Sequence, residues 1–249
     1  MKFIDTHTHL YSDAFDEDRI QVVQRAIDAG VTQMILPSIS SEYTSKMFEL
    51  QQHFPNNISM MMGLHPCDVK ENYEDELRFI ANELKERKFC AVGEIGIDLY
   101  WDKTTLDIQK IAFQTQIQWA KQYQLPINIH CRDAFDEVFE VLELEKGPEL
   151  FGVFHCFSGN LEQAKRAISY NLKLGIGGVA TFKNGKIDQF LAEIPLSEIV
   201  LETDAPYLAP APYRGKRNES SYVTLVAEKL AQIYQTDLAT IAEITTNNA

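Results

Sequence analysis

The 249-residue sequence is poor in cysteine. Its four cysteines, Cys67, Cys90, Cys131 and Cys156, form no Cys-x-x-Cys pair. This usage is typical of free thiols in a reducing compartment. Cys131 and Cys156 each directly follow a histidine, so on a strand they point to the opposite face, and we interpret both as packing residues.

Long apolar runs are also missing. No segment approaches the roughly 20 apolar residues that a membrane-spanning helix needs. The first five residues do not have the pattern of a signal peptide. We therefore expect a soluble, cytoplasmic protein that does not associate with a membrane.

Basic residues are scarce relative to acidic ones. The 23 Lys and Arg residues stand against 36 Asp and Glu residues, which gives a net charge of −13. Because phosphate binding depends on clustered basic side chains, this balance argues against a protein that coats duplex DNA. The densest basic cluster, Arg214, Lys216 and Arg217, lies in a proline-rich loop and is either a local basic surface or a solvated loop.

Strand-like and helix-like segments alternate along the whole chain. An apolar fraction of 45% is enough for a sizeable core, and the length fits one (β/α)8 barrel of about 250 residues. The predicted strands are 3–10, 33–38, 58–64, 90–97, 126–131, 151–157, 172–177 and 198–204, and the predicted helices are 18–28, 42–53, 74–87, 106–122, 134–144, 161–169, 187–192 and 221–235. This pattern predicts an α/β protein with a parallel sheet closed into a TIM barrel. We expect one domain over residues 1–249, because no linker or low-complexity run interrupts the pattern.

Two histidines lie two residues apart in the first predicted strand. Alternate side chains of a strand point the same way, about 6.6 Å apart, so His7 and His9 can bind one metal ion from one face. Taken alone, the pair is equally compatible with solvated or core histidines. Further candidate ligands are therefore needed to decide between these interpretations.

Four such residues, Glu94, His130, His155 and Asp204, lie near the ends of other predicted strands. The C-terminal ends of barrel strands surround a single mouth, where catalytic groups gather. Burying polar groups at five strand ends is unfavourable unless they have binding partners, and a shared metal site would supply them. We therefore interpret all six residues as metal ligands. Six ligands with a carboxylate able to bridge favour two ions about 3.5–4 Å apart, and the N/O ligand set is compatible with zinc, manganese or magnesium.

Six short motifs contain these residues. They are Asp5-Thr6-His7-Thr8-His9-Leu10, Gly63-Leu64-His65-Pro66, Gly93-Glu94-Ile95-Gly96-Ile97-Asp98, His130-Cys131-Arg132, His155-Cys156-Phe157-Ser158-Gly159 and Glu202-Thr203-Asp204-Ala205-Pro206-Tyr207. In this order and spacing, over essentially the whole chain, the series resembles the TatD-type metal-dependent deoxyribonucleases of the metal-dependent hydrolase superfamily. The resemblance is specific to the family and much less so to any one member.

The resemblance implies a TIM barrel that holds two divalent ions. It places His7, His9 and Asp204 on one ion and His130 and His155 on the other, with Glu94 bridging. It also implies hydrolysis of DNA phosphodiester bonds, typically as an exonuclease on single strands or duplex ends, and it implies no obligate protein partner. Where many members have Asn-Glu-Pro after the basic cluster, this chain has Asn-Glu-Ser-Ser at 218–221, a difference that we expect to affect the mobility of a substrate-facing loop.

Three residues are candidates for the catalytic chemistry. Asp204 can accept the proton of an attacking water, although its role is alternatively that of a ligand alone. Glu94 would hold both ions. His65 is not needed as a ligand, so it orients a phosphate or protonates a leaving group, or else it makes a structural hydrogen bond.

Candidate contacts to the substrate surround these residues. Arg132 can fork onto a phosphate, or it forms a structural salt bridge. Ser158 and Gly159 can bind phosphate oxygens, or they cap the helix that begins near residue 161. Lys183 and Arg214 are further candidates.

Two acids should lie one layer below the ligands. Asp5 precedes His7 by two residues, and Glu202 precedes Asp204 by two. Buried carboxylates need partners, so we predict that each accepts a hydrogen bond from a ligand imidazole or a neighbouring hydroxyl.

Three functions remain open from the sequence. The first is a two-metal nuclease acting on DNA ends. The second is a metallohydrolase of a small amide, ester or lactone, or of an aminoacyl ester on tRNA, because the same ligands polarise carbonyl groups. The third is a non-catalytic, metal-stabilised binding protein, which the number of ligands disfavours.

Overall fold

The computed structural model describes residues 1–249, and its strands form one parallel sheet in the order β1 to β8. The strands are β1 Phe3–Asp5, β2 Val31–Leu36, β3 Ile58–Met62, β4 Ala91–Asp98, β5 Ile127–Arg132, β6 Gly152–Phe154, β7 Leu172–Ile176 and β8 Ile199–Leu201. The sheet closes between its first and last strands, where the Thr6 amide donates to the Leu201 carbonyl (3.0 Å) and the Asp204 amide donates to the His7 carbonyl (2.9 Å). The predicted TIM barrel is confirmed.

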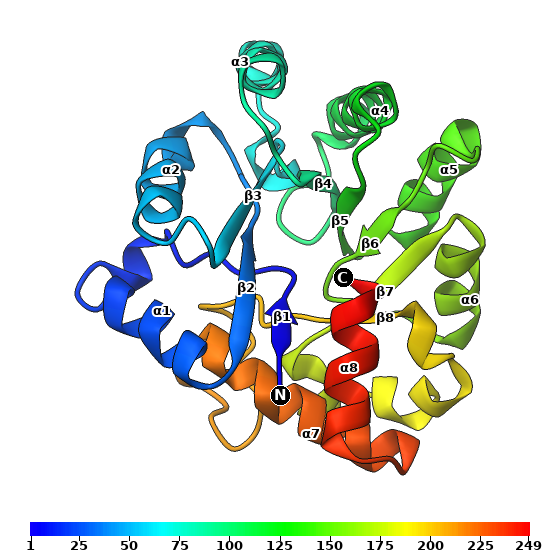
Figure 1. The fold of residues 1–249 in the computed structure, drawn as a ribbon. Helices are drawn as coiled ribbons and strands as arrows, with labels where there is room; N and C mark the ends of the chain where they lie inside the picture. Colours follow the sequence, from blue (N-terminus) through cyan, green and yellow to red (C-terminus); the bar gives the residue numbers. More distant parts are fainter.

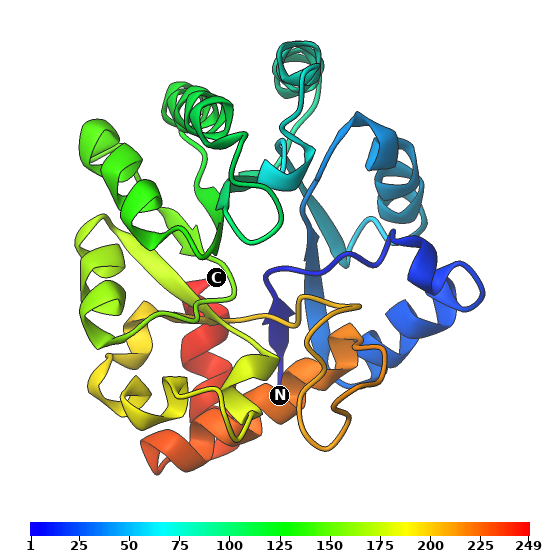
Figure 2. The same cartoon turned by 180° about the vertical axis from the view of Figure 1, so that it is seen from behind.

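Helices surround the strands on the outside, as Figures 1 and 2 show. They are α1 Arg19–Asp28, α2 Thr44–His53, α3 Tyr73–Glu86, α4 Leu106–Tyr123, α5 Phe135–Glu145, α6 Leu161–Ser169, α7 Val223–Tyr234 and α8 Leu238–Asn248. Each helix packs an apolar face on the barrel, because apolar residues recur every three to four positions. In α4 this face comprises Ala112, Phe113, Ile117 and Ala120. None of the helices is long and apolar enough to cross a membrane.

Most of the interior belongs to one continuous cluster of buried apolar residues. Phe154, at the end of β6, packs against Phe135 and Phe157 with ring centroids 5.6 and 5.5 Å away. This contact fixes the strand end from which His155 follows. All four cysteines are free, as predicted.

Three predicted strands are shorter than expected. The strands β1, β6 and β8 end before the residues predicted as ligands, which lie on segments just beyond them. These segments still bond to their neighbours: the Thr8 amide donates to the Ile35 carbonyl, and the His155 amide donates to the Ile129 carbonyl. The regular ladder therefore stops where side chains turn toward the barrel axis.

The helix predicted over 187–192 was wrong, because two short 3-10 helices, Ile187–Gln189 and Leu191–Glu193, occupy this segment. A helix of six residues is marginal by itself, since nucleation is costly. The Tyr234 hydroxyl also donates to the Leu191 carbonyl (2.6 Å) and the Ile194 carbonyl (2.7 Å), which holds the end of this segment to α7. Pro195 then disfavours a helical conformation at Ile194.

The last helix, α8, was not predicted. Its N-cap is Asp237, whose carboxylate accepts from the Thr240 amide at 2.8 Å. At its other end, the Asn248 side chain donates to the Leu196 and Ile199 carbonyls. Figures 1 and 2 show α8 crossing the strands on one side only, in front of them in the first view and behind them in the second.

Candidate metal centre

Five of the six histidines gather at the C-terminal ends of the strands, together with Glu94 and Asp204. His7 and His9 follow β1 on an extended segment held by hydrogen bonds to β2 and to the segment after β8. Their Nε2 atoms lie 3.1 Å apart. The predicted shared orientation of this pair is therefore observed, although the segment lies beyond the regular strand.

A first set of donor atoms surrounds these two nitrogens. Glu94 Oε2 lies 3.2 Å from His7 Nε2 and 3.5 Å from His9 Nε2. Asp204 Oδ1 lies 3.8 and 3.5 Å from the same two atoms. Ligand atoms about 2.0–2.1 Å from a tetrahedral ion are about 3.3 Å from one another, so these separations suit one ion.

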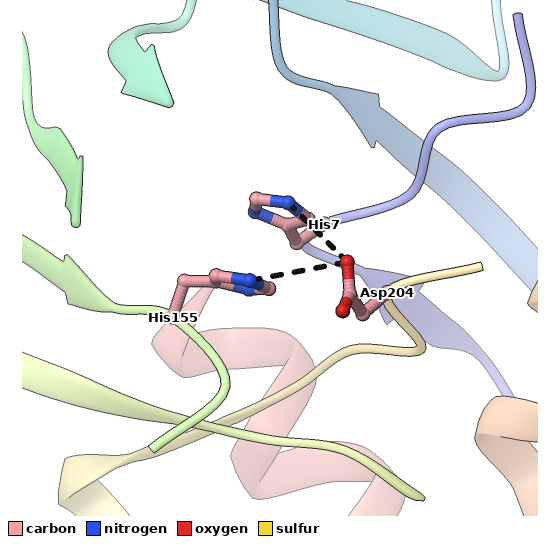
Figure 3. A group of neighbouring side chains, drawn as sticks. All are labelled: His7, His155 and Asp204. Atoms are coloured by element: carbon pink, nitrogen blue, oxygen red, sulfur yellow. Dashed lines mark ion pairs between the residues drawn. The ribbon is translucent and has the colours of Figure 1, made fainter. Parts of the chain in front are cut away.

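A second set of donor atoms faces the other oxygen of Glu94. Glu94 Oε1 lies 2.9 Å from His130 Nδ1, 3.4 Å from His65 Nε2 and 3.7 Å from His155 Nε2. The carboxylate of Glu94 thus stands between two groups of imidazoles and offers one oxygen to each. The rings of His7 and His155 stack with centroids 3.4 Å apart, and Figure 3 shows Asp204 at one side of both, with Oδ1 3.8 and 3.9 Å from their Nε2 atoms.

The arrangement fits divalent cations. Glu94 Oε2 is buried and has no hydrogen-bond partner, although it lies beside two imidazole nitrogens. A buried carboxylate oxygen without a donor is strongly unfavourable, and a bound cation removes that cost. The donor set of imidazole nitrogens and carboxylate oxygens matches zinc, manganese or magnesium.

Three residues that the sequence did not identify orient the imidazoles through their second ring nitrogens. Asn128 Oδ1 lies 2.8 Å from His7 Nδ1, and Asp98 Oδ2 lies 2.9 Å from His130 Nε2. The Tyr11 hydroxyl lies 2.9 Å from His9 Nδ1 and donates to the Pro37 carbonyl, so it must accept from the histidine. When the imidazole is neutral, each contact places the ring proton away from the centre and leaves a lone pair that points into it.

His65 has the opposite tautomer. Its Nδ1 accepts a hydrogen bond from the Cys67 amide at 3.0 Å, so a neutral His65 carries its proton on Nε2. Burial lowers the pKa of His65, which favours this neutral form. The Nε2–H group points at Glu94 and His130. His65 therefore presents a donor to the centre, whereas His7 and His9 present lone pairs.

Of the two acids predicted beneath the ligands, Asp5 has a partner of the predicted kind and Glu202 does not. Glu202 Oε1 accepts from the Cys156 amide at 2.7 Å; it also lies 3.0 Å from His155 Nδ1, but these two atoms form no hydrogen bond. Asp5 accepts instead from the Thr203 hydroxyl (2.6 Å) and the Thr203 amide (2.9 Å). Burial raises the pKa of Asp5 to about 7 and that of Glu202 to about 8.

A glycine makes room for Glu202. A Cβ atom at Gly175 would lie 2.2 Å from Glu202 Oε2. Any other residue at this position would clash with the carboxylate unless the carboxylate moved. Glycine at this position of β7 therefore leaves the space that the Glu202 side chain occupies.

Charges in the centre are strongly coupled. Burial raises the pKa of Glu94, but His65 and His7 outweigh it, and the pKa lies well below its usual range. Burial likewise opposes the charge on His130, but hydrogen bonds to Asp98 and Glu94 raise its pKa to about 9. The centre without an ion therefore favours a proton on His130 Nδ1, the atom that would contact a cation.

The predicted substrate contacts lie around the mouth with different partners. Arg132 ends β5 and stacks over Tyr100, and no carboxylate lies within ion-pair distance of it. Arg214 stacks over Phe182 with its guanidinium carbon 3.5 Å from the ring centroid. Ser158 and Lys183 are exposed, and Gly159 is half-buried. The cap of α6 is Asn160, with a capping box to Gln163, and neither Ser158 nor Gly159 serves as this cap.

The loop after β8 is tied to the barrel where the sequence departs from the family pattern. Asn218 is fully buried, and its side chain donates to the Thr203 and Tyr207 carbonyls, both at 2.7 Å. Arg25 forms an ion pair with Glu219 at 2.6 Å, and the Ser220 hydroxyl lies 3.1 Å from that of Thr8. The backbone on both sides of Asp204 is therefore anchored.

Comparison with known proteins gives the family. The model of the TatD related DNase family matches residues 4–249. The chain is 39% identical over 246 residues to the metal-dependent hydrolase YabD of Bacillus subtilis, a match that covers 98% of this chain and 96% of that protein. It is 30% identical over 251 residues to the 3'-5' ssDNA/RNA exonuclease TatD of Pectobacterium parmentieri, covering 98% and 96% of the two chains.

A solved structure agrees with these matches. The crystal structure of YjjV, a TatD homologue from Escherichia coli, superposes with a TM-score of 0.92 at 32% identity, covering 99% of this chain and 95% of that one. The fold, the clustered candidate ligands and the matched sequence thus lead to one conclusion. The chain belongs to the TatD-related DNase family of metal-dependent hydrolases.

Proposed function

We propose that this protein is a two-metal exonuclease that hydrolyses phosphodiester bonds of DNA. The observation that carries the proposal is the position of Glu94, whose Oε2 faces His7 and His9 while Oε1 faces His130 and His155. One carboxylate between two imidazole groups is what a pair of ions about 3.5–4 Å apart requires. Relatives named as ssDNA/RNA exonucleases support a nucleic-acid substrate.

In this proposal, His7, His9 and Asp204 hold one ion, His130 and His155 hold the other, and Glu94 bridges them. When bound, such ions activate water and stabilise charge on the phosphate and on the leaving oxygen. In the neutral imidazoles, Asn128, Tyr11 and Asp98 each accept the proton of the other ring nitrogen, so the lone pair is on the nitrogen that would face an ion.

Asp204 is the proposed base. Burial raises its pKa, but its hydrogen bond to His9 and the charges of His155 and His7 outweigh burial and lower the pKa from its usual value. The side chain is therefore ionised at neutral pH and can accept a proton. Its Oδ1 lies 3.8 Å from Nε2 of His7 and 3.9 Å from Nε2 of His155, so it is near one imidazole of each donor set (Figure 3).

His65 is the proposed donor to the substrate. Its Nε2–H is fixed by the Cys67 amide and points at the centre, so it can donate a hydrogen bond to a phosphate oxygen. The same proton can pass to the leaving oxygen when the bond breaks. Arg132, Ser158, Lys183 and Arg214 remain the proposed contacts to the rest of the strand.

The test measures release of nucleotides from end-labelled single-stranded DNA. The protein is stripped with a chelator and then supplied with Mg²⁺, Mn²⁺ or Zn²⁺. Asp204→Asn removes the proposed base, and Asp136→Asn, an exposed acid on α5, is the matched control. We expect metal-dependent release by the wild type and by Asp136→Asn, and little or none by Asp204→Asn.

Two outcomes would overturn parts of the proposal. If the wild type binds two ions but releases no nucleotides from DNA, the substrate assignment is wrong, and RNA, aminoacylated tRNA and small esters and amides come next. If one ion per chain supports full activity, the two-metal assignment is wrong.

A further inference from the structure

Exposed aromatic side chains occur on this protein only next to the metal centre. Of its 14 Phe, 10 Tyr and 2 Trp residues, three are exposed: Trp101 (71%), Tyr207 (57%) and Tyr100 (52%). Tyr100 and Trp101 follow Asp98 by two and three residues, and Tyr207 follows Asp204 by three. Large aromatic rings left in water beside a site are typical of ligand contacts.

Asp98 fixes the backbone of the first two rings to the metal centre. Its Oδ1 accepts from the Tyr100 amide at 2.9 Å and the Trp101 amide at 3.3 Å. Its Oδ2 contacts His130 Nε2 at 2.9 Å. One side chain therefore sets the position of a proposed metal ligand and of both rings. In Figures 1 and 2 the loop between β4 and α4 extends toward the middle of the barrel.

Arg132 lies against the same rings. Its guanidinium carbon is 3.7 Å from the centroid of Tyr100 and 5.6 Å from that of Trp101. The two rings meet edge to face, with centroids 4.8 Å apart and planes at 89°. The group thus combines flat apolar surfaces with a cation that no carboxylate neutralises.

We propose that Tyr100, Trp101 and Arg132 form a stacking platform for an unpaired nucleobase of the substrate strand. This inference rests on the proposed nuclease function and adds the part of the nucleotide that this surface recognises. A nucleotide offers a flat base and a charged phosphate at short range, which matches rings and a guanidinium side by side. Every base has a stacking face, so the platform accepts any sequence.

The platform favours single strands. A base that stacks on Trp101 must leave its own stack, which costs little in a single strand and more in a paired one. Tyr207 lies across the centre from this platform, beside His9, with ring centroids 6.0 Å apart. A strand that crosses the metal centre therefore passes exposed rings on both sides.

The first test reads binding directly through Trp101. The second tryptophan, Trp119 on α4, is removed by Trp119→Phe so that Trp101 is the only indole. The protein is titrated in chelator, where no cleavage occurs, with a single-stranded oligonucleotide and with an abasic strand of equal length. We expect quenching of Trp101 fluorescence by the first, and affinity for the abasic strand weaker by roughly 5- to 150-fold.

The second test uses the metal-loaded enzyme. We expect Trp101→Ala to raise KM for single-stranded DNA by a similar factor while it leaves cleavage of the abasic strand unchanged, and Trp101→Phe to keep most of the affinity. Leu144→Ala is the matched control, since Leu144 is equally exposed (70%) but lies at the end of α5. It should behave as wild type.

The outcomes separate this proposal from the proposed function. If the wild type releases nucleotides, Trp101→Ala has the same KM as the wild type, and intact and abasic strands bind equally, the platform is refuted. The proposed nuclease function is then still supported. If the wild type neither binds nor cleaves any strand, both proposals are wrong. If Leu144→Ala weakens binding as Trp101→Ala does, the effect is not specific to the platform and the assignment is wrong.

Discussion

Replacing Asp98 with asparagine should weaken one proposed metal site and spare the other. Asp98 Oδ2 is 2.9 Å from His130 Nε2, whereas its Oδ1 accepts from two loop amides. An asparagine keeps one acceptor oxygen, which the two amides hold, and turns its NH2 group toward His130. Two donors cannot face each other, so Nε2 must become the acceptor and the ring proton must move to Nδ1.

The cost follows from this change of tautomer. His130 Nδ1 lies 2.9 Å from Glu94 Oε1 and is the atom that would contact an ion. A proton fixed there must be displaced before ligation. A hydrogen bond to a charged group contributes about 1.5–3 kcal/mol, and partners that orient a ligand histidine typically account for about 10–100-fold in metal affinity. His7 and His9 do not touch Asp98, so the other ion should bind as in wild type.

The assay is a competition titration against a chromophoric chelator that resolves two binding steps. Asp102→Asn is the control, because Asp102 lies in the same loop but bonds only to Thr104. We expect the affinity of one step to fall by about 10–100-fold in Asp98→Asn and neither step to change in Asp102→Asn. If both steps weaken equally, or neither does, the assignment of His130 and Asp98 to one of two ions is refuted.

Three further predictions concern stability. Burial raises the pKa of Glu145, but hydrogen bonds from Lys121 and two glutamines outweigh burial and lower the pKa in the folded protein. The ionised side chain therefore stabilises the fold above its unfolded pKa, and this stabilisation is lost as the pH falls through its folded pKa. In Glu145→Gln, the free energy of unfolding measured with urea should fall less steeply as the pH is lowered. Phe154→Ala should destabilise by about 3–5 kcal/mol in urea unfolding, since the ring is 1% exposed. Asn218→Ala leaves the buried Thr203 carbonyl and the partly buried Tyr207 carbonyl without this donor and should cost about 1–3 kcal/mol in the same assay, whereas a loss under 1 kcal/mol would contradict the anchoring role.

The barrel was predictable because its signal is local. Each strand and each helix shows its own period in the sequence, and eight repeats leave few other folds. The prediction for 187–192 was wrong in part for a non-local reason: the Tyr234 hydroxyl, from α7, contacts the carbonyl of Leu191 and that of Ile194 just beyond the segment. The missed helix α8 had a local signal, since Asp237 stands three residues before Thr240 as an N-cap does.

The six candidate ligands were predictable because each stands at a strand end and all strand ends meet at one mouth. Their partners were not, since pairing across strands depends on register. Asn128 meets His7 across 121 positions, a contact that no local pattern encodes. The contact of Asp98 with the centre was easier to predict from the sequence, because Asp98 follows Glu94 by four positions on β4 and is paired with Arg132 of β5.

The acidic composition is compatible with the proposed polyanionic substrate, because the groups proposed to bind it lie at the mouth of the barrel. A net charge of −13 opposes retention of nucleic acid along the outer surface. Attraction then has to come from the metal centre, from Arg132 and Arg214, and from exposed rings whose stacking does not depend on net charge. Binding groups at the mouth and negative charge on the outer surface suit an enzyme that removes nucleotides one at a time. Such an enzyme needs to bind the strand only where it cuts it. On this argument, the scarcity of basic residues that argues against a duplex-coating protein is compatible with the proposed action at the end of a single strand.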